Sequence, residues 1–538
     1  MKKIVFLTIA TLLVLGLVLT GCNGNGVENV IKIAVVGPMT DLQGQNHWDG
    51  ATLAMEEIND AGGVTVGGVD YTVELVAVET KEATEGELGD TGSANLLAVI
   101  DDMAFCVGGF RTEAVQVYRE VAMEAEKVFI NCGAATDSLQ FSVVTNYDKY
   151  KYWFKGTPYN STFLVKSLLK MASTIGGGVL AATLVGYNAA VKADYQIGSP
   201  QTVPLRVVIL MENAAWCTGI VGAAQYYLPA MGFNVTNTIL VDPTAATIGP
   251  GNWATIIADK PHIIFTAFSG SVGAVYSSER VTNGVPAVTI GINVPGQQLL
   301  HWVNTDGDCE GEILLDTWAV GLNQTPETGA WVDAFVARFG RYPVYTAGTY
   351  DSIKQGCRAI EDTQSFDSDV IVAWLEDPDN AMDDSVGTPK IQYYPMPADT
   401  LETGVTYALN ESQVLALYPN IGSAWMRFSP ALPPPYWEAA MGYTQSDWLV
   451  GESSKPHIAH DTVYGPGYMT GIGSQWQKEG GVGAGQKVGI WPVYLGEDPV
   501  TKFKLTDQYG YWNFQYPGTE KYILTIGGML NIAWDPYA

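Results

Sequence analysis

Basic residues are scarce in this sequence of 538 residues, in which 28 Lys and Arg stand against 56 Asp and Glu, so that the formal net charge is -28. Nucleic acids and anionic lipid surfaces both bind clusters of Lys and Arg. The charge therefore argues against a protein that binds either of them. We interpret the acidic excess as a solubility device, which can also steer cationic ligands.

Cysteine is also rare, with 6 residues in the whole chain. Those that follow Cys22 are Cys106, Cys132, Cys217, Cys309 and Cys357. They show no CxxC spacing, which argues against a zinc site, and their odd number leaves at least one thiol unpaired even in an oxidising compartment. Cys106 and Cys132 each lie at the end of an apolar run, where we expect buried free thiols.

Recognisable catalytic motifs are missing. Ser269-Gly270-Ser271 lacks the GxSxG frame of a nucleophile elbow, and Gly108-Gly109 has neither a GxGxxG frame nor a Walker Lys. His457-x-x-His460-Asp461 can be read as a metal or acid-base cluster, but it lies in a loop-rich segment with no clear third ligand. With no catalytic residue, metal or cofactor to nominate, we expect a protein that is not an enzyme.

The first 21 residues have the pattern of an export signal. Lys2 and Lys3 precede an apolar run over residues 4–19, which is too short to span a bilayer comfortably. Leu19-Thr20-Gly21-Cys22 then places small residues before a cysteine, which is the pattern of a bacterial lipoprotein with lipid on Cys22. An ordinary signal peptide or a membrane-anchoring helix is the alternative. Residues 22–30 are expected to form a flexible tether.

Two blocks of alternating strands and helices follow. In the first block the apolar spacing predicts strands over residues 31–36, 71–79, 104–107 and 128–131, with helices over 48–61, 92–101 and 112–125. In the second it predicts strands over 205–211, 235–240, 263–267, 287–291 and 313–319, with helices over 162–175, 220–231, 253–258, 273–280, 329–339 and 345–361. This alternation predicts an α/β fold with parallel sheets covered on both faces. After about residue 377 we expect loops and short strands.

An ordered set of short segments carries a resemblance to a known family. The segments are IAVVGPMT (33–40), EEIN (56–59), GG (62–63), VGGFRT (107–112) and FINCGAAT (129–136). Together they resemble the branched-chain amino acid (Leu/Ile/Val-binding) type of ABC transporter substrate-binding protein, which has the type I periplasmic-binding fold. The resemblance is strong over residues 31–361 and weaker afterwards, where 465–468 and 475–477 look like the closing strands.

The resemblance implies two Rossmann-like lobes joined by three crossovers, with a loop-rich C-terminal extension. We place lobe one at residues 27–155 and 318–365, and lobe two at 156–317 and 366–538. In such sheets a ligand lies beyond the carboxyl ends of the strands, here in the cleft between the lobes. Binding would then close the lobes by a hinge motion.

Two loops that follow predicted strands are candidates for the polar end of a ligand. Around Arg111 and Thr112, main-chain N–H groups at a helix start attract a carboxylate, and the guanidinium can form a bidentate pair with it. Pairing of Arg111 with a surface acid is the alternative. In the next loop the resemblance implies that Ala134, Ala135 and Thr136 hold a ligand carboxylate, whereas a plain turn would use the same small residues.

Aromatic residues near strand ends are candidates for the apolar part of the pocket. They are Trp48, Phe110, Tyr159, Trp216 and Phe268. Aromatic faces bury apolar ligand surface and can hold a cation, although each ring could equally pack in the core or between the lobes. Tyr350 falls within a helix and is expected in the core.

Asn293 departs from the pattern of the family. Amino-acid-binding members usually carry an acidic residue near this position, which balances the ammonium of the ligand. A buried ammonium without a partner is costly. An amide, a urea-like compound or a carboxylic acid without an amine therefore fits as well as an α-amino acid.

These observations predict an extracytoplasmic, membrane-anchored solute-binding component of an ABC importer, monomeric and without a cofactor. The resemblance implies a small-molecule ligand, a permease contacted directly and an ATPase as partners. A ligand-sensing receptor of the same fold that feeds a membrane kinase or receptor is the alternative. An enzyme in the C-terminal segment, dependent on His457 and His460, is a third.

Overall fold

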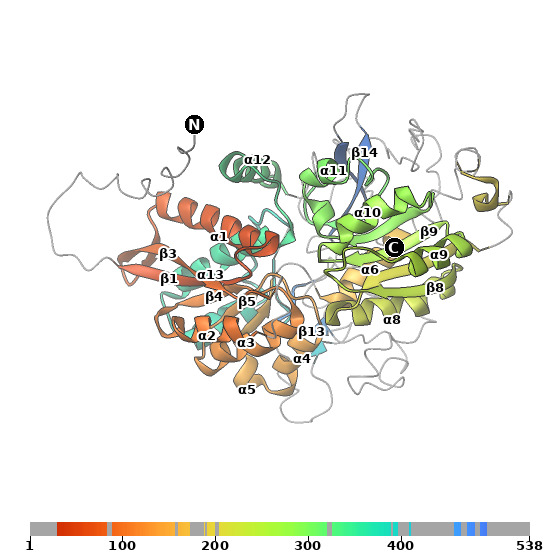
Figure 1. The fold of residues 1–538 in the computed structure, drawn as a ribbon. Helices are drawn as coiled ribbons and strands as arrows, with labels where there is room; N and C mark the ends of the chain where they lie inside the picture. Colours follow the sequence, from red (N-terminus) through yellow and green to blue (C-terminus); the bar gives the residue numbers. More distant parts are fainter. Residues whose placement is uncertain are drawn as a thin grey trace, which may run out of the picture.

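Two lobes lie side by side in the computed structural model, each built on its own sheet (Figure 1). The structure describes residues 29–82, 89–156, 160–172, 188, 191–198, 204–319, 325–388, 391–395, 408–409, 457–463, 471–478 and 485–491. Cys22, the export signal, Tyr159 and residues 465–468 lie outside these ranges. In the part of the chain that is described, no helix combines the length and the hydropathy needed to cross a bilayer.

The first lobe contains a 6-stranded sheet in the order β2-β3-β1-β4-β5-β6. Its strands are β1 (Val30–Gly37), β2 (Val64–Val66), β3 (Val69–Glu79), β4 (Phe105–Gly108), β5 (Phe129–Asn131) and β6 (Trp153–Lys155). The helices of this lobe are α1 (Leu42–Asp60), α2 (Asp90–Leu97), α3 (Thr112–Glu124), α4 (Ser138–Thr145), α5 (Tyr147–Tyr150), α12 (Thr328–Phe339), α13 (Thr349–Thr363) and α14 (Ser368–Glu376). Helix α1 packs on α13, and α2 packs on α3.

The second lobe contains a 7-stranded sheet in the order β15-β14-β11-β10-β9-β7-β8. Its strands are β7 (Arg206–Glu212), β8 (Asn234–Val241), β9 (Ile263–Phe268), β10 (Val288–Asn293), β11 (Ile313–Asp316), β14 (Ile472–Lys478) and β15 (Gly485–Trp491). Its helices are α6 (Ser161–Ala172), α8 (Ala215–Ala230), α9 (Pro250–Asp259), α10 (Val272–Thr282) and α11 (Leu300–Asn304). Strands β12 (Ala408–Leu409) and β13 (His457–Ile458) pair separately.

The central strands are buried along their whole length, as in β4, β9 and β10. These strands pair in parallel with their neighbours, which is the arrangement that continuous apolar runs favour because helices cover both faces of the sheet. The predicted α/β fold with two parallel sheets is therefore confirmed. Antiparallel strands occur at the edges, where β2 pairs with β3 and β14 with β11.

Three parts of the structure differ from the predicted elements. Helix α1 begins at Leu42 rather than near Trp48. Position 44 in its first turn requires glycine, because a Cβ there would lie 2.0 Å from the Pro38 carbonyl oxygen. Helix α8 begins at Ala215, five residues before the start that the sequence predicted at residue 220. Helix α14 was not predicted, and its apolar face packs into the core of the first lobe, beyond the boundary that the sequence placed at residue 365.

In the described part of the chain, the backbone passes three times between the two lobes. It crosses after β6, again after β11, and a third time between Ala459, in the core of the first lobe, and β14. The Thr462 hydroxyl donates to the Gly156 carbonyl, 2.8 Å away, and so ties the first crossing to the third. All three crossings lie at the lobe boundary, so a small rotation about them changes the distance between the facing loops.

Candidate ligand-binding site

The loops after β4 and β5 meet at a close contact between glycines. Gly108 and Gly109 have φ values of 116° and 89°, which L side chains rarely adopt. A Cβ on Gly133 would lie 1.7 Å from the Gly109 carbonyl oxygen, so only glycine allows the second loop to approach the first. The contact brings Arg111 beside Ala135.

Asn131, at the end of β5, shapes the second loop. Its side-chain oxygen accepts hydrogen bonds from the main-chain N–H groups of Gly133 (3.3 Å) and Ala134 (3.1 Å). The N–H groups of the next two residues, Ala135 and Thr136, donate to no residue in the described part of the chain. The Thr136 hydroxyl lies 2.6 Å from that of Thr112, which joins the two loops. This leaves two adjacent main-chain donors for an acceptor from outside the protein.

A cavity lies between the lobes beside these loops. From the first lobe it is lined by Phe110, Arg111, Gly133, Ala135 and Tyr345. Residues of the second lobe that line it include Leu164, Trp216, Ser269, Ile292, Val294 and Gln297. Its mainly apolar wall, drawn from both lobes, is that of a site for a small organic molecule.

Four of the predicted site residues line this cavity together. They are Phe110, Arg111, Ala135 and Trp216. Ala134, Thr112 and Thr136 belong to the same two loops but do not line the cavity; the Ala134 carbonyl instead accepts hydrogen bonds from Asn131 and Lys155. Tyr159 lies outside the described residues.

The other predicted residues point elsewhere. Trp48 is half-buried in the middle of α1 and packs on the core of the first lobe. Phe268 is fully buried against Tyr276 on the far side of β9, with 5.3 Å between the ring centroids. The Asn293 amide donates to the Gly273 carbonyl at 3.1 Å and is buried away from the cavity. For Phe268 and Asn293 the reason is strand alternation, because the neighbours Ser269, Ile292 and Val294 line the cavity instead.

Comparison with known proteins identifies the family. The sequence model described as periplasmic binding protein matches residues 30–393, which is more than half of the chain. The chain belongs to the periplasmic binding protein family. This is a family of solute-binding proteins. No curated protein sequence matches the chain.

Solved structures share the fold of this periplasmic binding protein. A Silicibacter pomeroyi protein assigned to branched-chain amino acid ABC transport is 15% identical with a TM-score of 0.56, covering 91% of this chain and 99% of that one. An ABC transporter solute-binding protein from Rhodopseudomonas palustris, solved with 3,4-dihydroxybenzoic acid, is 17% identical with a TM-score of 0.52 over 68% and 88%. A Streptococcus pneumoniae branched-chain amino acid binding protein, solved with isoleucine, is 16% identical with a TM-score of 0.50 over 64% and 88%. At these identities the likeness shows the fold.

Among the described residues that line the cavity of the binding protein, Arg111 is the only cation. Its guanidinium lies 5.9 Å from the centroid of the Phe110 ring. Its Nε is buried, and no described residue accepts a hydrogen bond from it. The Arg111 main-chain N–H donates to the buried Glu82 carboxylate at 2.9 Å, and burial raises the pKa of Glu82 to about 7. The arrangement leaves a cation in the cavity wall with capacity for an anion.

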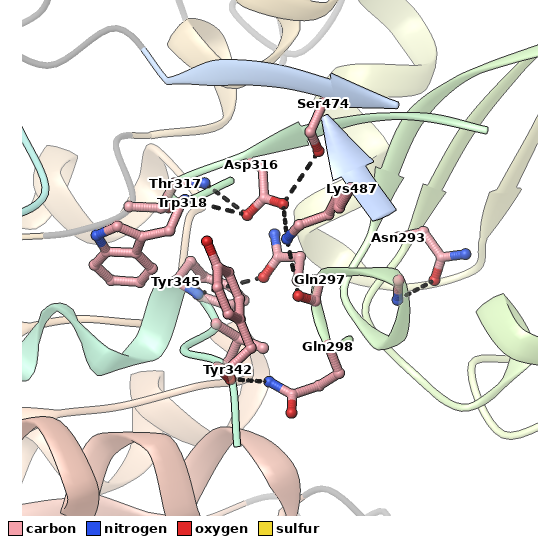
Figure 2. Close-up of polar contacts among 12 residues, drawn as sticks. Asn293, Gln297, Gln298, Asp316, Thr317, Trp318, Tyr342, Tyr345, Ser474 and Lys487 are labelled. Atoms are coloured by element: carbon pink, nitrogen blue, oxygen red, sulfur yellow. Dashed lines mark hydrogen bonds and ion pairs between the residues drawn. The ribbon is translucent and has the colours of Figure 1, made fainter. Parts of the chain in front are cut away.

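The acidic residue of the wall, Asp316, is held by the C-terminal strands (Figure 2). Its carboxylate forms an ion pair with Lys487 of β15 and accepts a hydrogen bond from Ser474 of β14 at 3.3 Å. Both side chains of the pair are buried, and burial lowers the pKa of Lys487 while Asp316 opposes that change. Lys487 also donates to the Gln297 carbonyl at 2.8 Å. The pair could not be predicted from local sequence, because Asp316 and Lys487 are 171 residues apart.

Trp216 is fixed in the wall by a second buried acid. Its indole N–H donates to Glu212 at the end of β7, with a distance of 2.6 Å. The other oxygen of Glu212 accepts from the main-chain N–H groups of Ser269 (2.8 Å) and Gly270 (3.1 Å). The indole is therefore held rigidly in the first turn of α8, and a ligand meets its apolar surface.

His460 is part of the packing at the lobe boundary rather than of the cavity wall. Its ring stacks on Phe154 with 4.0 Å between centroids, and its Nε2 lies 2.6 Å from Glu376. Among the described residues no group of three or more His, Cys, Asp or Glu could hold a metal ion. The cysteines after Cys22 are buried and free, and burial raises the pKa of the Cys132 thiol to about 11.

Proposed function

We propose that this protein is the extracytoplasmic solute-binding component of an ABC importer, which captures a small organic molecule between two closing lobes. The observation that carries the proposal is the cavity whose walls come from both lobes. A ligand there contacts both sheets through their strand-end loops, so its binding free energy favours the closed arrangement over an open one.

The cavity separates a polar end from an apolar end. Arg111 and the free N–H group of Ala135 form the polar end, which suits a carboxylate. Trp216 and Ile292 cover the remainder, which suits an apolar or aromatic body. The two neighbours solved with isoleucine and 3,4-dihydroxybenzoic acid hold ligands that both carry a carboxyl group.

The proposed setting of the protein follows from its N-terminal sequence. Lipidation of Cys22 would anchor the chain at the membrane, and the tether over residues 22–30 would let the two lobes reach a permease. A separate ATPase subunit would drive import. Mass spectrometry of the membrane fraction tests the anchor, because a diacyl modification on Cys22 is expected and a free N-terminus at another residue contradicts it.

A thermal-shift screen of amino acids, amides and small acids tests ligand capture. A ligand that binds only the folded state adds about 2.7 kcal/mol at 100 times its Kd, which raises Tm. We expect Trp216→Ala to abolish the shift, because it removes a large part of the cavity wall. Phe366→Ala is the matched control, since that ring is 41% exposed on the first lobe. The proposal fails if no compound of these three classes raises Tm.

A further inference from the structure

We infer that the cavity selects small organic anions that lack an ammonium group, such as a carboxylate on an apolar body, and discriminates against zwitterionic α-amino acids. This rests on the proposed function and narrows its ligand class. It is carried by an asymmetry in the charges around the cavity. The cation in the wall has a free donor, whereas the oxygens of Asp316 in the wall and of Glu212 behind it are occupied by donors of the protein.

The free cation is Arg111. Its Nε is buried without a described acceptor, although the side chain lies in the cavity wall. The Glu82 carboxylate accepts the main-chain N–H of Arg111 and the hydroxyls of Thr80 and Tyr118 rather than the guanidinium. Asp41 and Asp242 interact with Arg111 electrostatically, without a hydrogen bond or ion pair to its guanidinium among the described contacts. A ligand carboxylate is thus the group that completes the hydrogen bonding of Arg111.

Asp316 cannot act as the counter-ion of a ligand ammonium without giving up an existing partner. One oxygen accepts from Lys487 and Ser474, and the other accepts from the main-chain N–H groups of Thr317 (2.8 Å) and Trp318 (3.4 Å). Lys487 is itself an ammonium, so it already occupies the place that the ammonium of an amino acid would need (Figure 2). The C-terminal strand β15 therefore supplies a built-in cation for the only acid that lines the cavity among the described residues.

Glu212, the acid behind Trp216, is occupied in the same way. It accepts from the indole N–H of Trp216, from the hydroxyl and N–H of Ser269, and from the N–H of Gly270. Asp137 has one oxygen without a described partner, but it is buried outside the cavity wall and its other oxygen accepts from Thr162. Neither acid offers a free oxygen inside the cavity.

These contacts predict how a ligand's charge affects its affinity. A carboxylate gains charge-assisted hydrogen bonds from Arg111 and needs no rearrangement of the wall. An ammonium loses its water and finds only oxygens that already have donors, which is the costly case for a buried charge. The expected preference for an acid over the matching amino acid is about 100-fold in Kd, as for other sites that leave a buried charge unpaired.

Calorimetry of the full chain with two matched series tests this inference. One series is 3-phenylpropanoate, phenylalanine and 3-phenylpropanamide, and the other is 4-methylpentanoate, leucine and 4-methylpentanamide. We expect the acid of at least one series to bind, and the amino acid of the same series to bind about 100-fold more weakly. The matching amide should also bind weakly, because it lacks the negative charge that pairs with Arg111. Tighter binding of the amino acid or the amide overturns the inference and leaves ligand capture standing. If no probe binds, the inference fails, and the thermal-shift screen decides the proposed function separately.

Two variants test the role of Lys487 in this selectivity. Lys487→Met leaves the Asp316 carboxylate without its cation, so the ratio of acid affinity to amino-acid affinity is expected to fall at least about 10-fold. The double variant Asp316→Asn/Lys487→Met has neither charge and is expected to keep the preference for the acid. Equal ratios in the wild type and in a folded Lys487→Met variant overturn the role of Lys487. If that variant does not fold, the two ligand series on the wild type still decide the inference.

Discussion

The Glu113 carboxylate in the first lobe accepts a hydrogen bond from the main-chain N–H of Ala215 in the second lobe, with a distance of 2.9 Å. Ala215 is the first residue of α8, where main-chain N–H groups have no partner within the helix. The contact therefore places a negative charge at the positive end of a helix dipole across the cleft. The next residue of that helix, Trp216, lines the cavity, so the same contact also positions the ligand wall.

Glu113→Ala is predicted to weaken ligand binding without changing ligand preference. Loss of a charged hydrogen bond at a helix start destabilises the closed arrangement of the lobes by about 1 kcal/mol, which corresponds to about a fivefold rise in Kd. Calorimetry with any ligand found by the screen measures it. Glu124→Ala, at the exposed end of the same helix α3, is the control and should leave Kd unchanged. A lower Tm with an unaltered Kd would show that the contact serves stability alone.

Arg111→Gln is predicted to reduce the affinity for an acidic ligand by about 10-fold to 100-fold, because a hydrogen bond to a charged group contributes about 1.5–3 kcal/mol. The affinity of Arg111→Lys should lie between those of the wild type and Arg111→Gln, since an ammonium keeps the charge but loses the bidentate geometry. Arg338→Gln is the control, because Arg338 is 53% exposed and pairs with Glu56 outside the cavity. Equal Kd values for the wild type and Arg111→Gln would place the carboxylate elsewhere.

Lys487→Met is predicted to lower the free energy of unfolding by about 3–5 kcal/mol, because it leaves the buried Asp316 carboxylate without its cation. Asp316→Asn/Lys487→Met should lose less than Lys487→Met, since it leaves no lone charge in the interior. Urea denaturation of the wild type, Lys487→Met, Asp316→Asn and the double variant gives the coupling energy between Asp316 and Lys487. Additive losses would mean that the two side chains do not interact.

The local part of the site was predictable from sequence. The loops after β4 and β5 follow short apolar strands, and parallel strands end at the same edge of a sheet, so Arg111 and Ala135 were expected to lie together. Trp216 was found by the same reasoning, because it follows β7 directly. Composition and order of elements also sufficed for the fold class.

The rest of the site depends on information that short segments do not hold. Phe268 and Ser269 are neighbours, and which of them faces the cavity is decided by the exact end of β9. Tyr345 reaches the cavity from the turn before α13, far from the other first-lobe residues in sequence. Lys487 reaches Asp316 only because β14 adds to β11, and β15 to β14, as antiparallel strands. The closing strand predicted at residues 475–477 is part of β14, but its pairing partners and β15 were not predicted.

Asp137 is predicted to make the stability of the protein fall as pH rises between about 4 and 7. Burial raises the pKa of this carboxyl from 3.8 to about 7 in the folded protein. Between these pH values Asp137 is protonated in the folded protein but ionised in the unfolded chain. The contribution of Asp137 to stability is therefore complete below pH 4 and is lost as the pH approaches 7. The slope from one such group is about 1.4 kcal/mol per pH unit. Glu312, whose pKa burial also raises to about 7, adds to the slope in the same direction.

Asp137→Asn isolates this effect, because an amide stays neutral at every pH and can still accept from the Thr162 hydroxyl. The unfolding free energy of the variant should therefore depend less steeply on pH, and the variant should gain stability relative to the wild type between pH 5 and pH 7. Urea denaturation at pH 5, 6 and 7 measures both slopes. Asp148→Asn, at an exposed position of α5, is the matched control and should keep the slope of the wild type. Parallel curves for the wild type and Asp137→Asn would show that Asp137 is ionised in the folded protein throughout this range.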